Sequence, residues 1–159
     1  MKLYLGIDPG LTGAIALVDG ETHCVMIEDM PTAARGHGRV RHEVDAGGVV
    51  HLLHGYADRI AHGVIEQLSA MPRQGVASMF SLGHSFGTVT AVIATLGVGF
   101  ELIAPARWKR VAQLPADKGL VLAAARRRWP GASLTRVKDH GRAEALFMAL
   151  LALQRHRGC

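Results

Sequence analysis

The first 28 residues constrain the fold most strongly, because short apolar runs alternate there with turn-forming residues. Runs at residues 3–7, 14–18 and 22–28 each have the length and composition of a single strand. Asp8-Pro9-Gly10 turns the chain after the first run, and Asp19-Gly20 is a dipeptide typical of tight hairpins. These features predict a three-stranded antiparallel meander at the start of a sheet.

The rest of the chain alternates helical and strand-like segments. Two further strands are expected at residues 63–66 and 99–104, where short apolar runs occur. Residues 30–42 are rich in glycine, proline and arginine and are expected to form a loop. Apolar residues at helical spacing, or proline and capping signals, predict helices at about 44–61, 79–96, 105–113, 117–129 and 143–155.

This order of elements, β-β-β-α-β-α-β-α-α, indicates an α/β fold. Three antiparallel strands followed by parallel crossovers predict a five-stranded mixed sheet with helices on both faces. The chain of 159 residues is long enough for one domain with a real core and too short for two large ones. A single domain over residues 1–159 is therefore expected.

Charged residues are distributed unevenly along the chain. Residues 1–104 carry six Lys and Arg against ten Asp and Glu, whereas residues 105–159 carry twelve against three. The whole chain has a formal charge of +5. A basic C-terminal third predicts a polyanionic partner, and nucleic acid is favoured over a membrane because no apolar anchor accompanies the charge.

Compartment signals point to a soluble cytoplasmic protein. The longest apolar stretch we identify, residues 91–100, is much shorter than the roughly 20 residues that cross a bilayer. Asp8 interrupts any signal-peptide core after a few apolar residues. Cys24 and Cys159 are far apart and form no CxxC motif, which favours a reducing compartment.

Carboxylates fall at the ends of the expected elements. Asp8 ends the first strand, Glu66 ends the fourth, and Asp139 and Glu144 lie just before and within the last helix. If the first and fourth strands are neighbours, these side chains meet at one sheet edge and repel one another unless divalent cations lie among them. Hard oxygen ligands favour Mg²⁺ or Mn²⁺ over zinc. Two such ions about 3.5–4 Å apart can support phosphodiester cleavage. Taken singly, each residue also suits a turn, a salt bridge or a helix cap.

Three motifs together resemble the RuvC-type Holliday junction resolvases, most closely their phage and prophage branch. They are Gly6-Ile-Asp-Pro-Gly-Leu-Thr-Gly13, Val64-Ile-Glu-Gln67 and Asp139-His-Gly-Arg-Ala-Glu-Ala-Leu146. The resemblance extends over nearly the whole chain. It implies an RNase H-like fold, a homodimer, and Mg²⁺-dependent paired incision of four-way DNA junctions during DNA recombination and repair, in the cytoplasm of a bacterial or phage-infected cell.

The resemblance also implies the site residues. Asp8, Glu66, Asp139 and Glu144 would be the metal ligands, around two Mg²⁺ ions with Mn²⁺ as an alternative. The bacterial enzymes usually place two acidic residues three apart on the last helix, whereas Asp139 and Glu144 are five apart. His140 lies four residues before Glu144 on the same helical face, and it is the alternative inner ligand or the group that orients the attacking water.

Further positions are expected to contact DNA. Lys109 and Lys118 match lysines of the family and would approach the scissile phosphate, with Arg107 in the same segment. In the loop after the fourth strand, bacterial relatives place an aromatic wedge at the junction centre. Met71 and Arg73 stand in that loop here, and an apolar side chain can unstack bases. This departure leaves room for cleavage of other branched DNA.

Other features receive structural interpretations. The long helix carries Gly83 and Gly87, which permit close backbone approach, and it matches the helix at the dimer interface of the family. We therefore expect a two-fold dimer through this helix, with Met79, Phe80 and Phe86 in the contact. Trp108 is expected to be a core or helix-packing residue. Three arginines of the expected glycine-rich loop are interpreted as a mobile flap: Arg35, Arg39 and Arg41.

Three competing functions share parts of this pattern. The residues Asp8-x-Gly10-x-Thr12-Gly13 resemble the phosphate-binding hairpin of the ATP-binding actin and sugar-kinase superfamily, which needs two domains. An RNase H-like ribonuclease would instead cleave RNA–DNA hybrids. A non-catalytic DNA-binding module would retain only a decayed acidic site. The intact carboxylates argue against the non-catalytic module. The resemblance to the resolvases implies a metal-dependent, structure-selective DNA endonuclease, a crossover junction endodeoxyribonuclease.

Overall fold

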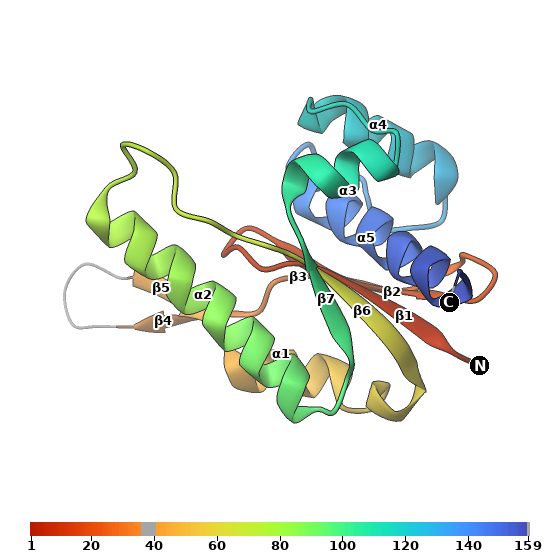
Figure 1. Cartoon of the computed structure of the whole chain (residues 1–159), viewed down its shortest axis with the longest axis horizontal. Helices are drawn as coiled ribbons and strands as arrows, with labels where there is room; N and C mark the ends of the chain where they lie inside the picture. Colours follow the sequence, from red (N-terminus) through yellow and green to blue (C-terminus); the bar gives the residue numbers. More distant parts are fainter. Residues whose placement is uncertain (36–40, 159) are drawn as a thin grey trace.

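The fold is built on a five-stranded mixed sheet, seen in a computed structural model that describes residues 1–35 and 41–158 (Figure 1). Its strands lie in the order β3-β2-β1-β6-β7. They span β1 (Leu3–Asp8), β2 (Ala14–Asp19), β3 (Cys24–Asp29), β6 (Ile60–Glu66) and β7 (Phe100–Ile103). β2 is antiparallel to both β1 and β3, whereas β6 is parallel to β1 and to β7. The predicted mixed sheet is confirmed.

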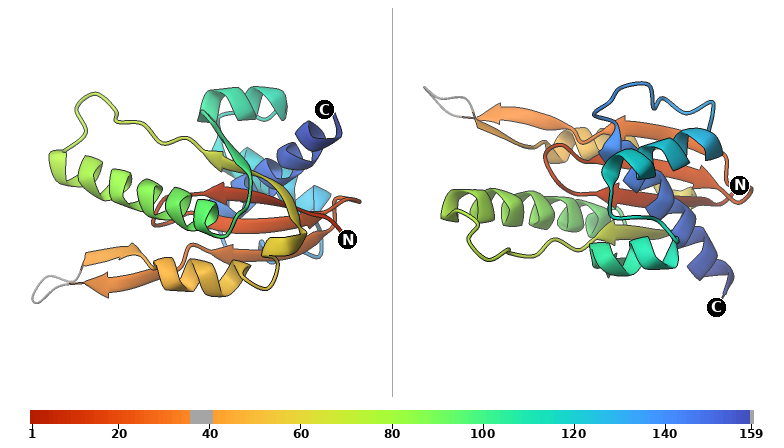
Figure 2. Two further views of the ribbon diagram at one scale, coloured as in Figure 1. Left: turned by 60° about the horizontal axis from the view of Figure 1, so that its bottom comes forward. Right: turned by 90° about the horizontal axis from the view of Figure 1, so that it is seen from above.

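Helices cover both faces of this sheet, as predicted (Figures 1 and 2). They are α1 (Ala46–Leu53), α2 (Val76–Thr95), α3 (Pro105–Val111), α4 (Lys118–Arg128) and α5 (His140–Arg157). The alternation of side chains along β1 divides the core in two. Leu5 and Ile7 pack with the cluster under α1 and α2, whereas Tyr4 packs with the cluster under α4 and α5.

α5 lies directly against β1 because a glycine stands at the crossing point. A Cβ on Gly6 would lie 2.0 Å from the carbonyl oxygen of Ala145, so only glycine allows this approach. A Cβ on Gly141 would lie 2.9 Å from the carbonyl oxygen of Thr12, in the turn between β1 and β2. These two contacts fix the N-terminal half of α5 beside the end of β1.

The helix expected at residues 44–61 is shorter in the structure. α1 ends at Leu53, a single 3₁₀ turn covers Ala57–Arg59, and β6 begins at Ile60 rather than at residue 63. Ile60 pairs with Leu3 in the parallel register of β6 and β1. Pairing with the sheet therefore overrides the helical spacing of the apolar residues.

The segment expected to be a loop contains a second, two-stranded sheet. β4 (Thr32–Arg35) and β5 (Arg41–Val44) pair antiparallel, with Ala34 opposite His42. Arg35 and Arg41 therefore lie on a hairpin rather than in a loop, and Arg39 lies outside the described residues. Local pairing of this kind leaves no signature in composition.

α2 is longer and more exposed than the sequence indicates. It contains no Asp, Glu, Lys or Arg over its 20 residues, and its mean hydropathy reaches 1.3. By length and composition alone it could cross a membrane, so the expectation that no apolar stretch is long enough was wrong. Only 22% of an 18-residue window of this helix is buried. α2 therefore presents an uncharged face to its surroundings.

Candidate active site

Three carboxylates gather at the edge of the sheet where β1 and β6 end. Asp8 is the last residue of β1 and Glu66 the last of β6, and the two strands are parallel with Ile7 opposite Ile65. The third carboxylate, Glu144, comes from the part of α5 that packs on Gly6. Glu66 and Glu144 are buried, and Asp8 is half-buried.

Burial and mutual repulsion make Asp8 and Glu66 hard to ionise. Burial raises the pKa of Asp8 to about 6, and the negative charge of Glu144 adds to the shift, while a backbone hydrogen bond from Gly10 opposes it. Burial likewise raises the pKa of Glu66 to about 7, with contributions from Asp8 and Glu144. The positive charge near Asp8 and Glu66 is therefore less than two ionised carboxylates at these positions would need.

Consecutive residues of α3 each hold one of the carboxylates. The indole N–H of Trp108 donates to Oε2 of Glu66 at 2.7 Å, and Trp108 is completely buried. Nζ of Lys109 lies 2.7 Å from Oε1 of Glu144. Pro105 begins α3 directly after β7, the neighbour of β6, and this short connection brings the helix to Glu66.

Sequence reasoning placed Trp108 in the core and missed its role at Glu66. The residue is indeed buried, but a buried indole N–H needs an acceptor. The sequence offered one signal: Trp108 stands next to a basic residue, shortly after an expected strand. The strand before that one in the chain ends at Glu66. Without the strand order, that signal did not identify the acceptor.

Two of the residues expected to contact DNA lie beside this cluster, and the other three are exposed on neighbouring segments of the chain. Lys109 and Lys118 both lie close enough to Asp8 to lower its pKa, and Lys118 is exposed at the start of α4. Arg107 is exposed on α3. Met71 and Arg73 are exposed in the loop between β6 and α2, on the chain that leaves Glu66. Arg73 has a φ of 67°, and the side chain of Gln74 accepts a hydrogen bond from the backbone of Met71, so this loop forms an ordered turn.

Asp139 is buried, and the structure does not bring it into the cluster. It stands at the N-cap position of α5 and accepts hydrogen bonds from the backbone N–H of Arg136 at 2.7 Å and from its Nε at 2.6 Å. Arg136 also binds Asp29, at the end of β3, and Arg142 binds Asp29 as well, at 2.7 Å. These two arginines lower the pKa of Asp29 to about 2. Asp139 therefore belongs to an ion-pair network that joins β3 to α5.

His140 follows Asp139 in the chain and precedes Glu144 by about one helical turn. It is the first residue of α5 and is half-buried. Its Nδ1 atom is buried and has no hydrogen-bond partner within the described ranges 1–35 and 41–158. That nitrogen is available to a ligand, and within these ranges it forms no hydrogen bond with the three carboxylates.

The donor set fits a hard divalent cation. In the part of the chain that the structure describes, no three His, Cys, Asp or Glu side chains already enclose a point where a metal could bind. Nevertheless, the raised pKa values of Asp8 and Glu66 indicate a deficit of positive charge, and Lys109 supplies one compensating cation at Glu144. Carboxylate oxygens are the ligands that Mg²⁺ and Mn²⁺ prefer. A metal ion bound by all three carboxylates would have to replace Lys109 as the partner of Glu144.

Comparison with solved structures identifies the fold. No protein-family model matches the chain, and no curated protein matches its sequence. Among solved structures, it is similar to T. thermophilus RuvC in complex with Holliday junction substrate, with a TM-score of 0.69 and 20% identity over 99% of this chain and 97% of the other. It is also similar to a further Thermus thermophilus RuvC structure, with a TM-score of 0.53 and 20% identity over 98% and 96% of the two chains.

The sheet order and helix arrangement thus define an RNase H-like fold, with a carboxylate cluster at one sheet edge. Among proteins with this fold, the chain is similar to RuvC over 99% of its length. The RNase H-like fold that the sequence motifs imply is confirmed.

Proposed function

We propose that this protein is a metal-dependent, structure-selective DNA endonuclease that resolves four-way junctions by paired, symmetric cleavage. The observation that carries the proposal is the buried cluster of Asp8, Glu66 and Glu144 at the end of β1 and β6. It occurs in a fold shared with a RuvC protein whose structure contains a Holliday junction substrate. A protein of this kind acts in the cytoplasm of a bacterial or phage-infected cell.

Asp8, Glu66 and Glu144 would hold Mg²⁺, or Mn²⁺ in its place, with two ions per site. When bound, the cations supply an activated water and stabilise the charge that develops on the phosphate oxygens. His140 is the further ligand or the group that orients the water, because its Nδ1 has no hydrogen-bond partner among the described residues. Asp139 is proposed to hold the start of α5 in place through Arg136 rather than to coordinate an ion.

The remaining side chains of the site orient the carboxylates and attract the substrate. Trp108 fixes the position of Glu66 through its hydrogen bond, at a place where water is excluded. Lys109 and Lys118 provide positive charge beside Asp8, which favours the approach of a phosphodiester. Their presence explains how a cluster of buried carboxylates can attract a polyanion.

The exposed residues around the site suit contacts with a branched substrate. Met71 lies in the loop that follows Glu66, and 66% of its surface is exposed. We assign it the role of an apolar wedge at the junction centre, with Arg73 and Arg107 on the phosphates. A single methionine is a weaker wedge than an aromatic ring, so cleavage of other branched DNA is expected beside cleavage of four-way junctions.

A homodimer would bring two such sites to opposite strands. α2 contains no charged residue, and a Cβ on Gly83 or Gly87 would meet nothing within 4 Å. These open positions allow the helix of a second copy to approach closely. An isologous contact through α2 would place the two carboxylate clusters symmetrically about a two-fold axis, as paired cleavage requires.

A cleavage assay on a panel of substrates tests this function. Purified protein is incubated with labelled four-way, three-way and linear duplex DNA and with an RNA–DNA hybrid, in Mg²⁺ and in EDTA. We expect Mg²⁺-dependent cleavage of the four-way junction in preference to linear duplex. Preferential cleavage of the hybrid would instead support a ribonuclease, and ATP binding in calorimetry without any cleavage would support the actin and sugar-kinase alternative. Cleavage must disappear in the Glu66→Gln variant while junction binding persists.

A further inference from the structure

The start of α5 rests directly on the turn between β1 and β2. Gly141, the second residue of α5, and Gly13, the residue before β2, are both buried. A Cβ on Gly141 would lie 2.9 Å from the carbonyl oxygen of Thr12, 3.0 Å from Cα of Gly13 and 3.1 Å from its carbonyl carbon. These distances are shorter than the roughly 3.5 Å at which carbon atoms pack without strain. The absence of a side chain at Gly141 therefore determines how closely the helix approaches the turn.

Gly13 in turn lies directly against Asp8. A Cβ on Gly13 would lie 2.1 Å from the backbone carbonyl oxygen of Asp8 and 2.9 Å from its carboxyl carbon. The backbone N–H of Gly13 donates to the carbonyl oxygen of Gly10 at 2.9 Å. The backbone N–H of Gly10 donates to Oδ1 of Asp8 at 3.3 Å. A displacement of Gly13 is therefore transmitted to the Asp8 carboxylate by direct contact and through the hydrogen bonds of the turn.

Glu144 is held on the other side of this contact. It lies three residues after Gly141, on the same face of α5, and its charge contributes to the raised pKa of Asp8. The next residue, Ala145, has its carbonyl oxygen 2.0 Å from the place of a Cβ on Gly6. This crossing leaves α5 little freedom beside Glu144. A displacement at Gly141 is therefore taken up by the turn, which moves Asp8 away from Glu144.

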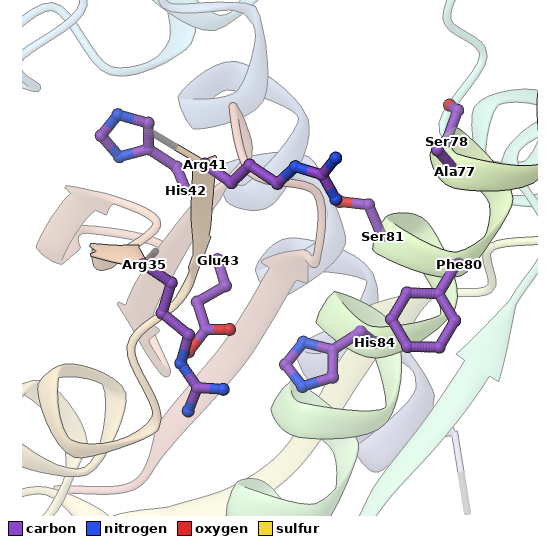
Figure 3. A pocket seen from close by; sticks show the side chains of 9 residues that line it. All are labelled: Arg35, Arg41, His42, Glu43, Ala77, Ser78, Phe80, Ser81 and His84. Carbon is purple, nitrogen blue, oxygen red and sulfur yellow. The ribbon is translucent and has the colours of Figure 1, made fainter. Parts of the chain in front are cut away.

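The glycine contact belongs to one chain and does not depend on the proposed dimer. Gly13 and Gly141 are buried within the chain. α2 faces the β4–β5 hairpin across a cleft of about 790 Å³, and the described residues that line this cleft come from these two elements (Figure 3). Pairing of two copies through α2 would therefore cover the surface around this cleft and leave the contact between the two glycines unchanged.

The separation of Asp8 and Glu144 matters because divalent cations differ in size. Mg²⁺ binds oxygen at about 2.0–2.1 Å, whereas Ca²⁺ binds it at about 2.3–2.6 Å. Two carboxylate oxygens on opposite sides of an ion therefore lie up to about 1 Å further apart around Ca²⁺ than around Mg²⁺. A methyl group on Gly141 would push the helix and the turn apart by roughly 0.5 Å. A single methyl group at this position thus changes the separation by an amount comparable to the difference between the two ions.

We propose that Gly141 is a positioning residue that sets the separation of Asp8 and Glu144 and thereby the size of the cation that they bind. The inference rests on the proposed function, because it concerns the metal site of the proposed nuclease. Gly141 has no side chain that could coordinate an ion. It acts through Gly13, on which it packs, and through the turn that follows Asp8.

Metal binding by Gly141→Ala, measured by isothermal titration calorimetry without DNA, tests the proposal. Mg²⁺ and Ca²⁺ are titrated separately into the metal-free protein, in a sucrose buffer that favours the folded state. Gly47→Ala is the matched control for helix propensity. Gly47 is likewise the second residue of a helix, but it is exposed, and a Cβ there would meet only Oδ1 of Asp45, at 3.4 Å. Asp29→Asn is the control for stability, because it loosens the start of α5 from β3 without changing the turn.

We expect Gly141→Ala to weaken Mg²⁺ binding about tenfold or more, the typical effect of disturbing the surroundings of a metal ligand, and to leave Ca²⁺ binding nearly unchanged. Both controls should keep the wild-type ratio of the two affinities. Glu144→Asp withdraws the carboxylate from Asp8 without touching the turn and should lower the same ratio. A wild-type ratio in Gly141→Ala, or an equal loss for both ions, would overturn the proposal. So would a variant that stays unfolded in sucrose, because Gly141 would then serve the fold alone.

Failure of this inference is distinguishable from failure of the proposed function, because the titrations require no cleavage. If the wild-type protein binds Mg²⁺ and cleaves four-way junctions but Gly141→Ala keeps the wild-type affinity ratio, only the role of Gly141 is wrong. If the ratio falls in Gly141→Ala but the wild-type protein cleaves no DNA, the positioning role holds and the nuclease assignment is wrong. If the wild-type protein binds neither ion, both are wrong.

Discussion

The indole N–H of Trp108 donates a hydrogen bond of 2.7 Å to Oε2 of Glu66. Both partners are buried, so the bond is not exchanged for water. The next residue, Lys109, pairs with Glu144. One turn of α3 thereby sets the positions of two carboxylates that come from distant parts of the chain, and the first two predictions concern this turn.

Trp108→Phe should impair metal use while leaving the fold intact, because phenylalanine keeps an aromatic ring at this position but cannot donate a hydrogen bond to Glu66. Loss of a group that orients a metal ligand typically costs about 10- to 100-fold in metal affinity or activity. We expect the Mg²⁺ concentration for half-maximal cleavage, and the Mg²⁺-induced thermal shift, to move by such a factor. Trp129→Phe is the matched control, since the Trp129 indole donates to the carbonyl oxygen of Thr22 at 2.7 Å. If both variants respond equally to Mg²⁺, Trp108 has only a packing role.

Lys109→Met should destabilise the metal-free protein and increase its response to Mg²⁺. Its partner Glu144 is buried, and removing one member of a buried ion pair costs about 3 kcal/mol because the other charge is left uncompensated. A divalent cation can take over the role of the lysine. Chemical unfolding in EDTA and in Mg²⁺ measures both effects, and an unchanged increment from Mg²⁺ would contradict a shared position for lysine and metal.

Stability of the metal-free protein should fall as the pH rises from 5 to 7. Folding raises the pKa of Asp8 from 3.8 to about 6 and of Glu66 from 4.5 to about 7. The native state therefore binds more protons than the unfolded chain in this range, so the stability from these groups is present below pH 4 and is lost through pH 6 to 7. Melting temperatures measured in EDTA across this range test the effect. Asp8→Asn should flatten the difference between pH 5 and 7, and Mg²⁺ should restore stability at pH 7. A wild-type slope in the variant would count against the assignment of these pKa values.

Asp139→Asn and Glu144→Gln should have opposite phenotypes. Asp139 pairs with Arg136 in the network that includes Asp29, so its variant should lower stability with little change in the Mg²⁺-induced thermal shift. Glu144→Gln should abolish most of that shift. Asp29→Asn, which breaks the same network from β3, should reproduce the Asp139 phenotype. A complete loss of the Mg²⁺ response in Asp139→Asn alone would restore Asp139 to the ligand set.

The sequence predicted the sheet and the meeting of Asp8 with Glu66 because both depend on strand ends, which turn-forming residues and apolar runs mark clearly. It did not predict the β4–β5 hairpin. The two strands pair locally in a segment whose glycine and proline content is typical of a loop. The partner of Asp139 was also missed. Arg136 lies only three residues from Asp139. Its binding to both Asp139 and Asp29 depends on how β3 and α5 pack together.

Mapping of the cut positions on a four-way DNA junction tests the central claim most directly. Each strand is 5′-labelled in turn, and the junction is incubated in Mg²⁺ with wild-type protein or with Asp8→Asn, whose junction binding is verified by gel shift. We predict nicks at symmetric positions on two opposing strands with the wild-type protein, and a loss of cleavage of about 100-fold or more with the variant. Absence of cleavage by the wild-type protein, or cleavage by Asp8→Asn at the wild-type rate, would contradict the account.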